Sequence, residues 1–594
     1  MKNKLTILFF FFQFLLWGQN PELAQKYFDN GDFEKAAYAY QLLLDKFPYK
    51  QDYFYKLINS LQAIKKYNEA EKIIKSKNPQ SKPQYWVVLG YNYQLQKDSL
   101  KAQKYYQKAI KSVAKKTYFA YSVAESFKKY YLLDEALQTY QVAIQNGSRN
   151  NFYMQMALIY AEKNNSDLMF DNFLKLLSHR PDNLLSLQFY LSKYITQNPE
   201  NKNNQILKNK LIEKIKETQE AHWYRLLQWL YTQQKEYKKA FLQIKSLYRK
   251  GKAEISEIYQ LATTARNERK TKEARSIYRF IISQNLESEY AELSKLALLQ
   301  MDISFLLNED EKQAVHRRFQ TYLSENWSLD NFISLQILYA DFLAFHQGQT
   351  SQALDLLEQI EKQNLTRKQL AEVRLKKADI LLHNKMFNQA LILYTQVQLD
   401  FPNHPIGYKA TYYIARASFF QGDIDWAHSQ LKIIKSVASD LIANDAIDLD
   451  VTIINNKEEN DSLQTGLKKF ATAKFEIFRK KPEIALKILD TLKTDFKGQL
   501  IYDNALWEQG QIYEKQGKLK EALQNYQAII EHTTEDLLVD DTYFRMAMIY
   551  KNQGEIEKAK NLFKKIIVDY PASFWFVDAQ KYFRKLRNEA INEP

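Results

Sequence analysis

The chain contains no cysteine among its 594 residues. This absence excludes disulfide bonds, thiolate metal sites, cysteine nucleophiles and an N-terminal cysteine that could carry a lipid. Glycine and proline are also scarce, with 13 and 11 residues. A sheet-rich protein needs many tight turns, which those two residues commonly supply. The composition therefore favours a helical protein, and its apolar share of 45% is enough to bury a large core.

Signatures of catalysis are missing as well. The eight histidines lie at least 21 residues apart, so no His-Glu-x-x-His or similar metal-ligand spacing exists. There is no glycine-rich phosphate loop, and the Ser-x-x-Lys matches at Ser112 and Ser429 lack the companion motifs that a serine nucleophile needs. We therefore expect no enzyme activity, no metal and no cofactor.

Charge of one sign is in moderate excess. Lysine and arginine number 84 against 69 aspartate and glutamate, which gives a net charge of +15. Such an excess could suit nucleic acid, an anionic membrane surface or an acidic partner. The basic residues are spread along the whole chain without a block of five or more, so we interpret them as solvated outer helix faces.

The first residues have the three-part pattern of a secretory signal peptide. Residues 1–4 are basic, residues 5–17 are almost entirely apolar, and Gly18 precedes a polar stretch. An uncleaved anchor is the alternative, but this apolar run is shorter than the roughly 20 residues that span a membrane. We predict a signal peptide at residues 1–18 and therefore an exported protein, periplasmic or outer-membrane associated. Export also counts against nucleic acid as a partner.

One stretch, residues 85–109, organises the rest of the chain. It reads Trp86-x2-Leu89-Gly90-x2-Tyr93 and then Ala102-x3-Tyr106. The same spacing, a small residue followed twelve positions later by alanine, recurs along the chain. The physical reason is that two antiparallel helices approach closely only where neither carries a bulky side chain. The pairs are Ala24/Ala36, Gly90/Ala102, Ala124/Ala136, Ala262/Ala274, Ala378/Ala390, Ala415/Ala427, Ala473/Ala485, Gly510/Ala522 and Ala547/Ala559.

This pattern resembles the tetratricopeptide repeat (TPR), a helix–turn–helix unit of about 34 residues. The resemblance implies an all-α, right-handed solenoid of TPR pairs that binds other proteins. The alanines stand 32 to 34 residues apart in the N-terminal part and 37 apart in the C-terminal part, which predicts two sub-arrays. We expect a TPR array at 19–182, irregular repeats at 183–329 with a TPR-like 222–283, arrays at 330–435 and 469–572, a helical insert at 436–468 and a capping helix at 573–594.

In TPR proteins the first helix of each pair lines the groove in which partners commonly lie. Carried onto this chain, the resemblance places candidate partner-binding residues at Tyr91, Gln94, Tyr121, Glu125, Tyr412, Arg416, Phe419, Trp507, Gln511, Phe544 and Met548. The set mixes aromatic and charged side chains, which suits an amphipathic protein ligand. An alternative, equally compatible with the residues, is that Tyr91, Trp507 and Phe544 pack against the next repeat.

The connectors of the C-terminal repeats refine the resemblance. Aspartate–aromatic–proline segments such as 400–402 and 569–571 are similar to those of envelope TPR proteins of Gram-negative bacteria, namely the lipoprotein of the β-barrel assembly machine and the Tol-Pal-associated coordinator. The resemblance implies a scaffold in an outer-membrane or secretion assembly, with envelope proteins as partners and peripheral membrane association as an option. A cell-wall or carbohydrate binder that uses the aromatic groove is the alternative function.

Overall fold

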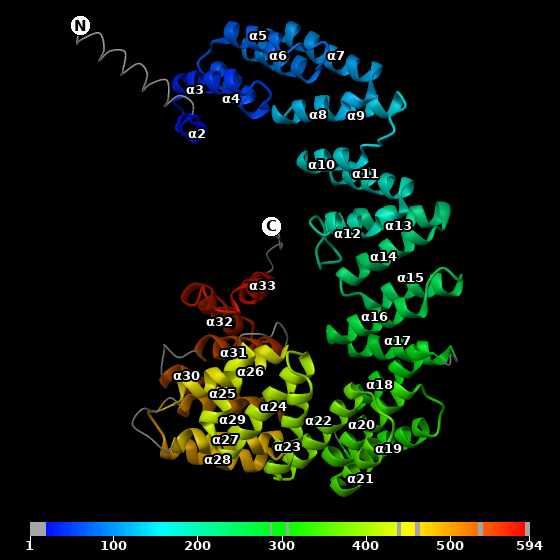
Figure 1. The fold of residues 1–594 in the computed structure, drawn as a ribbon, viewed down its shortest axis with the longest axis vertical. Coiled ribbons are helices and arrows are strands. Elements are labelled where there is room, and N and C mark those ends of the chain that lie inside the picture. The colour runs from blue at the N-terminus through cyan, green and yellow to red at the C-terminus, as the bar shows by residue number, and fades with distance from the viewer. Residues whose placement is uncertain are drawn as a thin grey trace, which may run out of the picture. The chain divides into compact units, whose positions relative to one another are not determined.

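The computed structural model describes residues 20–284, 288–304, 308–435, 441–457, 464–499, 501–532 and 538–587. Within these ranges every regular element is a helix, and consecutive helices pack in pairs (Figure 1). The predicted all-α solenoid of helix pairs is therefore confirmed. The predicted signal peptide, residues 1–18, and the last seven residues of the predicted cap lie outside the described residues.

The chain divides into two compact units, one ending at Glu257 and one beginning at Ile258. The division falls inside the segment 183–329, where the sequence predicts irregular repeats. It cuts through a single helix, α16 (Ile255–Asn267), whose Ala262 still carries the small residue of the pattern. The two units are described separately below.

The first unit consists of helix pairs from α2 to α15. Its N-terminal part alternates first and second helices without interruption, as the pattern of alanines predicts. The helices are α2 Pro21–Asp29, α3 Phe33–Lys46, α4 Gln51–Ala63, α5 Tyr67–Ser76, α6 Gln84–Leu95, α7 Ser99–Lys115, α8 Ala120–Lys129, α9 Leu133–Gln145, α10 Tyr153–Glu162, α11 Ser166–His179, α12 Leu184–Leu191, α13 Lys202–Thr218, α14 Ala221–Gln233 and α15 Tyr237–Arg249, with 3-10 turns η1 Thr117–Phe119 and η2 Pro181–Asn183.

The second unit continues the same pairing, beginning with α17 as the second helix after α16. Four of its described helices depart from the pairing: α18 and α19, which lie in a stretch without the alanine pattern, α26, which has no second helix, and α33, which follows the last pair. The helices are α17 Thr271–Ser283, α18 Glu289–Ile303, α19 Glu309–Leu323, α20 Leu329–His346, α21 Thr350–Glu361, α22 Arg367–His383, α23 Phe387–Asp400, α24 Pro405–Gln421, α25 Ile424–Lys435, α26 Leu441–Asn455, α27 Thr465–Phe478, α28 Pro482–Asp495, α29 Ile501–Lys515, α30 Leu519–His532, α31 Val539–Asn552, α32 Ile556–Asp569 and α33 Phe576–Leu586.

All nine small-residue pairs are buried, as are the large residues that follow the second alanine by four. In the two repeats with glycine, however, the small residue lies nearer to the large residue than to the alanine. A Cβ on Gly90 would lie 2.4 Å from the ring of Tyr106, and one on Gly510 would lie 2.4 Å from the ring of Tyr526. Glycine is therefore needed in these two repeats because a tyrosine ring of the second helix lies directly over it.

The turn inside most pairs uses the left-handed backbone conformation at one residue. Glycine occupies it at Gly31, Gly348, Gly422, Gly517 and Gly554, as expected from its freedom at positive φ. Eight further pairs adopt the same conformation with a residue other than glycine, and of these asparagine tolerates it best. These residues are Lys65, Lys97, Tyr131, Asn164, Lys235, Arg269, Lys385 and Lys480.

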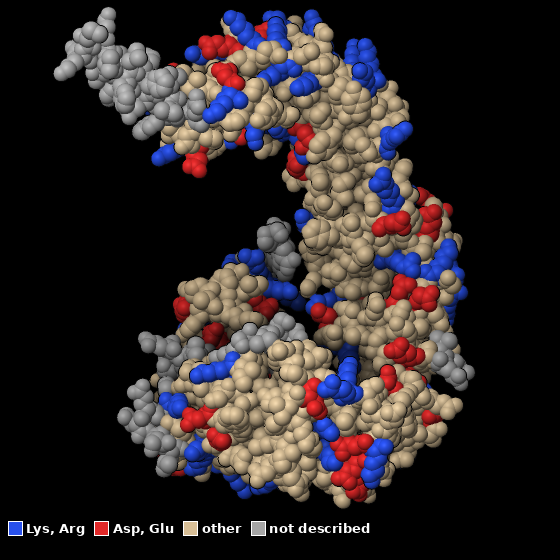
Figure 2. Space-filling view, in the orientation of Figure 1, with Lys and Arg blue, Asp and Glu red and all other residues tan. Residues whose placement is uncertain are grey.

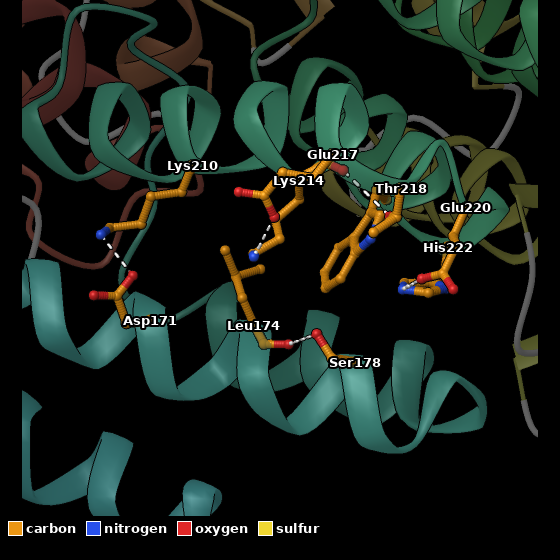
Figure 3. Close-up of polar contacts among 10 residues, drawn as sticks. Asp171, Leu174, Ser178, Lys210, Lys214, Glu217, Thr218, Glu220 and His222 are labelled. Carbon is orange, nitrogen blue, oxygen red and sulfur yellow. Dashed lines mark hydrogen bonds and ion pairs between the residues drawn. The ribbon is translucent and has the colours of Figure 1, made fainter.

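Helix α13 shows how the irregular part of the first unit is held together without the alanine pattern. Lys210 on α13 donates to Asp171 on α11 at 2.6 Å and lies 3.1 Å from Asp167 (Figure 3). At the other end of α13, Thr218 accepts a hydrogen bond of 3.0 Å from the indole of the buried Trp223. Ion pairs and a buried indole thus connect α11, α13 and α14.

The predicted insert at 436–468 contains α26 and the start of α27, and it changes the path of the second unit. After α26, the end of α27 lies against the turn that follows α22. Arg479 donates to the carbonyl of His383 at 2.8 Å, and the rings of Phe475 and Phe387 lie 5.0 Å apart. These contacts join residues almost one hundred positions apart, whereas most contacts of a solenoid join neighbouring repeats.

Helix α33 covers the last repeat in the way a capping helix does. The Trp575 ring, just before α33, stacks on Phe544 of α31 at 4.0 Å, and Tyr582 stacks on Phe563 of α32 at 5.4 Å. Four basic residues at the end of the described chain are exposed, namely Lys581, Arg584, Lys585 and Arg587. A cap of this kind shields the apolar face that the last pair would otherwise leave open.

Candidate partner-binding surface

We define the first-helix face as the positions three before, one after and four after the small residue of each first helix. The predicted partner-binding residues all occupy these positions. The structure shows that the position one after the small residue is used inside the repeat, because the tyrosine of the second helix reaches it. The hydroxyls of Tyr40, Tyr140 and Tyr394 donate to Gln25 at 3.0 Å, Glu125 at 3.3 Å and Asp379 at 2.6 Å, and the hydroxyl of Tyr278 lies 3.2 Å from that of Thr263.

The two repeats with glycine as the small residue use a different acceptor. Tyr106 lies over Gly90 and donates to Gln94 at 2.6 Å, while Tyr526 lies over Gly510 and donates to Glu514 at 3.1 Å. Because no Cβ keeps the ring away from the first helix, the hydroxyl reaches one helical turn further. Gln94 and Glu125, both predicted as partner-binding residues, therefore also anchor a tyrosine of their own repeat.

The sequence contains a signal for this hydrogen bond that the alanine pattern alone does not reveal. Where the second helix carries leucine or phenylalanine instead of tyrosine, the position after the small residue needs no acceptor. It is then Arg416 opposite Leu431, Lys474 opposite Leu489 and Met548 opposite Phe563. A buried tyrosine hydroxyl without a hydrogen-bond partner is costly, so an acceptor faces each tyrosine. Leucine and phenylalanine have no hydroxyl, so the same position can hold a cation or methionine.

In the first unit this face is rich in exposed or half-buried tyrosines. Tyr91 stacks on Tyr130 with ring centroids 4.1 Å apart, and the Lys129 ammonium lies 3.5 Å from the centroid of the Tyr55 ring. Tyr121 is 57% exposed. Tyr55, Tyr91 and Tyr121, from the successive first helices α4, α6 and α8, are what we call the aromatic surface; Tyr121 is its exposed member and the other two are half-buried.

In the second unit the first-helix face borders a cavity of about 330 Å³ lined by residues of α18, α20, α22 and α24. Its charged groups are partly paired: Lys376 donates to Asp341 at 2.6 Å, and Asp379 accepts from both Tyr394 and Arg416. Lys409 and Glu372 also line it. The cavity is therefore a polar groove, in contrast to the aromatic surface of the first unit.

Arg416 is the most constrained of the predicted residues. Its guanidinium lies 3.0 Å from Asp379, 4.4 Å from the Tyr413 centroid and 4.8 Å from the Phe478 centroid. Burial alone would lower the pKa of Arg416, but the Asp379 carboxylate and the surrounding tyrosines outweigh it and raise the pKa. Burial and Asp379 likewise raise the pKa of Tyr394 far above its usual range. The group is thus an internal ion pair that joins α22, α24 and α27.

Two of the predicted partner-binding residues are core residues in the structure, which corrects their assignment to a surface. Phe419 is fully buried among side chains of α24, α25, α26 and α27. Phe544 is 8% exposed and lies under Trp575 of the cap. Both corrections have the same physical reason: a following helix packs on the first-helix face and excludes a partner from it.

The other predicted residues of the second unit remain half-buried. Tyr412 lies beside Arg416, and burial raises the pKa of Tyr412. Trp507 packs against Tyr526 with ring centroids 5.5 Å apart, Gln511 is partly exposed, and Met548 contacts the core around Phe544. Of the whole predicted set, Gln94 and Tyr121 are the residues with exposed side chains, and both belong to the first unit.

Among the described residues no group of three or more histidine, aspartate or glutamate side chains could hold a metal ion. None of the helices in those ranges combines the length and hydropathy needed to cross a membrane. On the face shown in Figure 2, lysine, arginine and acidic residues are scattered among one another, with wide areas of other residues between them.

Comparison with solved structures returns helical repeat proteins at low similarity. The Naa15/Naa10 complex bound to HypK-THB has a TM-score of 0.28 at 12% identity, with 95% of this chain and 95% of that chain covered. The Cut9–Hcn1 hetero-tetramer of the APC/C has 0.23 at 10% identity, with 96% of each chain covered. A tetratricopeptide repeat protein from Parabacteroides merdae has 0.21 at 13% identity and covers 50% of this chain and 99% of its own. These TM-scores are too low to carry a conclusion about this chain.

Comparison with family models is more direct. No curated protein matches the chain. Models of the tetratricopeptide repeat match residues 83–112, which span the α6–α7 pair, and residues 504–532 and 541–573, which span the α29–α30 and α31–α32 pairs. The matched segments contain Gly90, Gly510 and Ala547, three of the nine small residues. The chain therefore contains tetratricopeptide repeats, the repeats of protein–protein interaction scaffolds.

Proposed function

We propose that this protein is an exported, non-catalytic scaffold that binds a partner protein along the first-helix face of its N-terminal unit, within an envelope assembly or secretion complex. The observation that carries the proposal is the aromatic surface of α4, α6 and α8. Tyr121 is 57% exposed and Tyr55 and Tyr91 are half-buried, and tyrosine rings supply rigid contact area at low entropic cost, which is typical of protein-binding surfaces. Export rests on the basic and apolar residues at the N-terminus.

The proposed partner is a protein rather than nucleic acid. The first-helix face of the N-terminal unit pairs its lysines with acidic or aromatic groups: Lys128 lies 3.5 Å from Glu125, and Lys129 lies over Tyr55. Nucleic-acid sites instead require a run of unpaired basic residues that can contact phosphates. An amphipathic segment with apolar anchors and a few charges fits such an aromatic face.

Site-specific photo-crosslinking tests the proposal in the native cell envelope. A photo-reactive amino acid at Tyr121 should give a discrete crosslinked product that contains an envelope protein. Tyr38 is the matched control, because it is 59% exposed against 57% for Tyr121 but lies on a second helix, α3. Equal crosslinking at both positions, or none at Tyr121, would contradict binding along the first-helix face.

The second candidate is a cell-wall or carbohydrate binder. It is favoured by the exposure of three tyrosines on and around α8, Tyr118, Tyr121 and Tyr131, which stand 71%, 57% and 85% exposed. Retention of the purified protein on peptidoglycan, abolished in a Tyr121→Ala variant, would favour this function over a protein scaffold. Cell fractionation and N-terminal sequencing of the mature protein test export separately.

A further inference from the structure

A second cavity lies outside the first-helix face, between α17, α18 and α19 of the second unit. It has a volume of about 270 Å³ and is lined by three arginines, Arg275, Arg279 and Arg318, together with Asp302 and Tyr322. Helices α18 and α19 lack the alanine pattern and touch each other much less than the helices of a regular pair do. The missing small residues therefore explain why a space remains here.

The charges around this cavity do not balance. Asp302, which is 13% exposed, is contacted by Arg275 on one carboxylate oxygen and by Arg318 on the other. Both of its oxygens are thus engaged, and Arg279 has no acidic partner among the described residues. Three guanidinium groups against one carboxylate leave two positive charges at the cavity.

Part of this positive charge lies where water is largely excluded: the Arg275 side chain is 21% exposed, whereas that of Arg318 is 41% exposed and Arg279 is exposed. Burial lowers the pKa of Arg275, which shows that its charged form is disfavoured by its surroundings. Cations in a partly buried site stay favourable only when anions or hydrogen bonds compensate them. The cavity therefore has the electrostatics of a site that is completed by a bound anion.

We propose that this arginine cavity binds the phosphate group of a small phosphate monoester. Such a group carries about −1.5 to −2 charge at neutral pH, which matches the surplus of two, whereas a single carboxylate would leave it half compensated. Guanidinium groups present paired N–H donors that match phosphate oxygens. Burial raises the pKa of Tyr322, so its phenol keeps the proton that it can donate to the same group.

Isothermal titration calorimetry on the full chain tests this proposal at pH 7.5 and constant ionic strength. The probes are glycerol 3-phosphate, as a soluble monoester, and inorganic phosphate. We expect saturable binding of the monoester with one site and a Kd of roughly 1 mM or tighter. Lowering the pH to 5.5 should weaken binding, because the phosphate loses its second charge with a pKa near 6.

Arg279→Gln is the decisive variant, since Arg279 makes no ion pair with any described residue whose loss would disturb the fold. It should weaken monoester binding roughly tenfold. Arg317→Gln on α19 is the control, because Arg317 is exposed, adjacent in sequence to Arg318 and outside the cavity; its affinity should stay within about twofold of the parent.

Three outcomes would overturn the proposal. The first is an absence of saturable monoester binding in the parent protein. The second is binding of inorganic phosphate with exclusion of the ester, which would mean that the cavity admits the free ion alone. The third is an equal loss in the Arg279 and Arg317 variants, which would indicate general attraction to a basic protein. The proposal is independent of the protein partner of the first unit.

Discussion

Two repeats, one in each unit, place the same positions of the first-helix face in opposite environments. Tyr121 and Glu125 on α8 correspond to Tyr412 and Arg416 on α24. Tyr121 is largely exposed, and Glu125 serves the tyrosine of its own repeat. Tyr412 is half-buried, and Arg416 binds Asp379 of the preceding repeat and lies over Phe478 of α27.

This difference shows that the same position of the repeat has different roles in different repeats. Its role depends on the second helix and on the next first helix. With Tyr140 on the second helix the position supplies an acceptor and leaves the face open. With Leu431 there, the position is released for a cation, which then ties three first helices together. The first-helix face is therefore expected to be closed in the second unit and open in the first.

The largest expected effect is that of Arg416→Ala. The substitution leaves the carboxylate of Asp379, 15% exposed, without its cation, and breaking a buried pair in this way costs about 3 kcal/mol. Hydrogen exchange measured by mass spectrometry should show faster exchange in peptides of α22, α24 and α27. Glu125→Ala in the first unit should cost less, about 1 kcal/mol, because it removes one long hydrogen bond to a carboxylate that is 34% exposed and leaves no buried charge unpaired.

The two variants should differ clearly if the comparison holds. If Arg416→Ala and Glu125→Ala both lowered stability by the same small amount, Arg416 would not be what closes the first-helix face of the second unit. The purified variants should first be compared by circular dichroism, so that a global loss of helix is not mistaken for local opening. Urea unfolding followed in peptides of each unit then reports the free energy of unfolding where the substitution lies.

An acid-dependent loss of stability is expected next, at the contact that holds α27 in place. The Lys480 ammonium lies 2.9 Å from Nε2 of His346, which must therefore be neutral to accept. Burial, followed by the charge of Lys480, lowers the pKa of His346 from 6.5 to about 4. Asp341 opposes this shift and Lys312 adds to it.

The direction in which stability changes with pH follows from the lowered pKa of His346. Between pH 6.5 and about 4 the unfolded chain binds the proton that the folded chain rejects, so stability falls as the pH falls through this window. For this half-buried group the loss should be on the order of 1–2 kcal/mol. His346→Gln should flatten the pH dependence of thermal unfolding in the second unit. An unchanged pH profile in that variant would assign the acid sensitivity to other groups.

The smallest expected effect concerns the turns with positive φ. Lys97 in the first unit and Lys385 in the second both hold the left-handed conformation, with φ of 63° and 67°. Lys97→Gly should stabilise the first unit by about 0.5 kcal/mol, since relief of backbone strain exceeds the added entropy of the unfolded chain. Lys385→Gly should gain less, because Lys385 also lies 3.9 Å from Glu476 of α27. A larger gain in stability from Lys385→Gly than from Lys97→Gly would mean that the Lys385–Glu476 ion pair does not help to hold α27 in place. Thermal unfolding of both variants measures the difference.

Much of the architecture could be predicted from the sequence because TPR packing is local. Ala24 and Ala36, or Gly90 and Ala102, are buried because each small residue receives the large residue from its own second helix, within about sixteen positions of sequence. The same locality relates Tyr140 to Glu125 and Tyr394 to Asp379. A pattern of residue types at fixed spacing therefore suffices to locate the pairs and their tyrosine anchors.

The candidate site was predicted less well, because exposure depends on neighbours that a repeat pattern does not specify. Phe419 and Phe544 occupy groove positions, yet α27 and the cap cover the faces that carry them. The arginine cavity lies where the pattern is missing, so the alanine spacing contains no signal for it. Its charges come together only when α17, α18 and α19 are placed in space.

The sequence by itself thus determined the helix pairs and the tetratricopeptide repeat, since these follow from contacts between residues close along the chain. The tertiary structure alone decided which faces remain open. Helix α26 lacks a second helix, and after it α27 returns to the turn behind α22, where Arg479 meets His383. Such contacts between distant residues depend on the summed geometry of several repeats, and no short stretch of sequence encodes that sum.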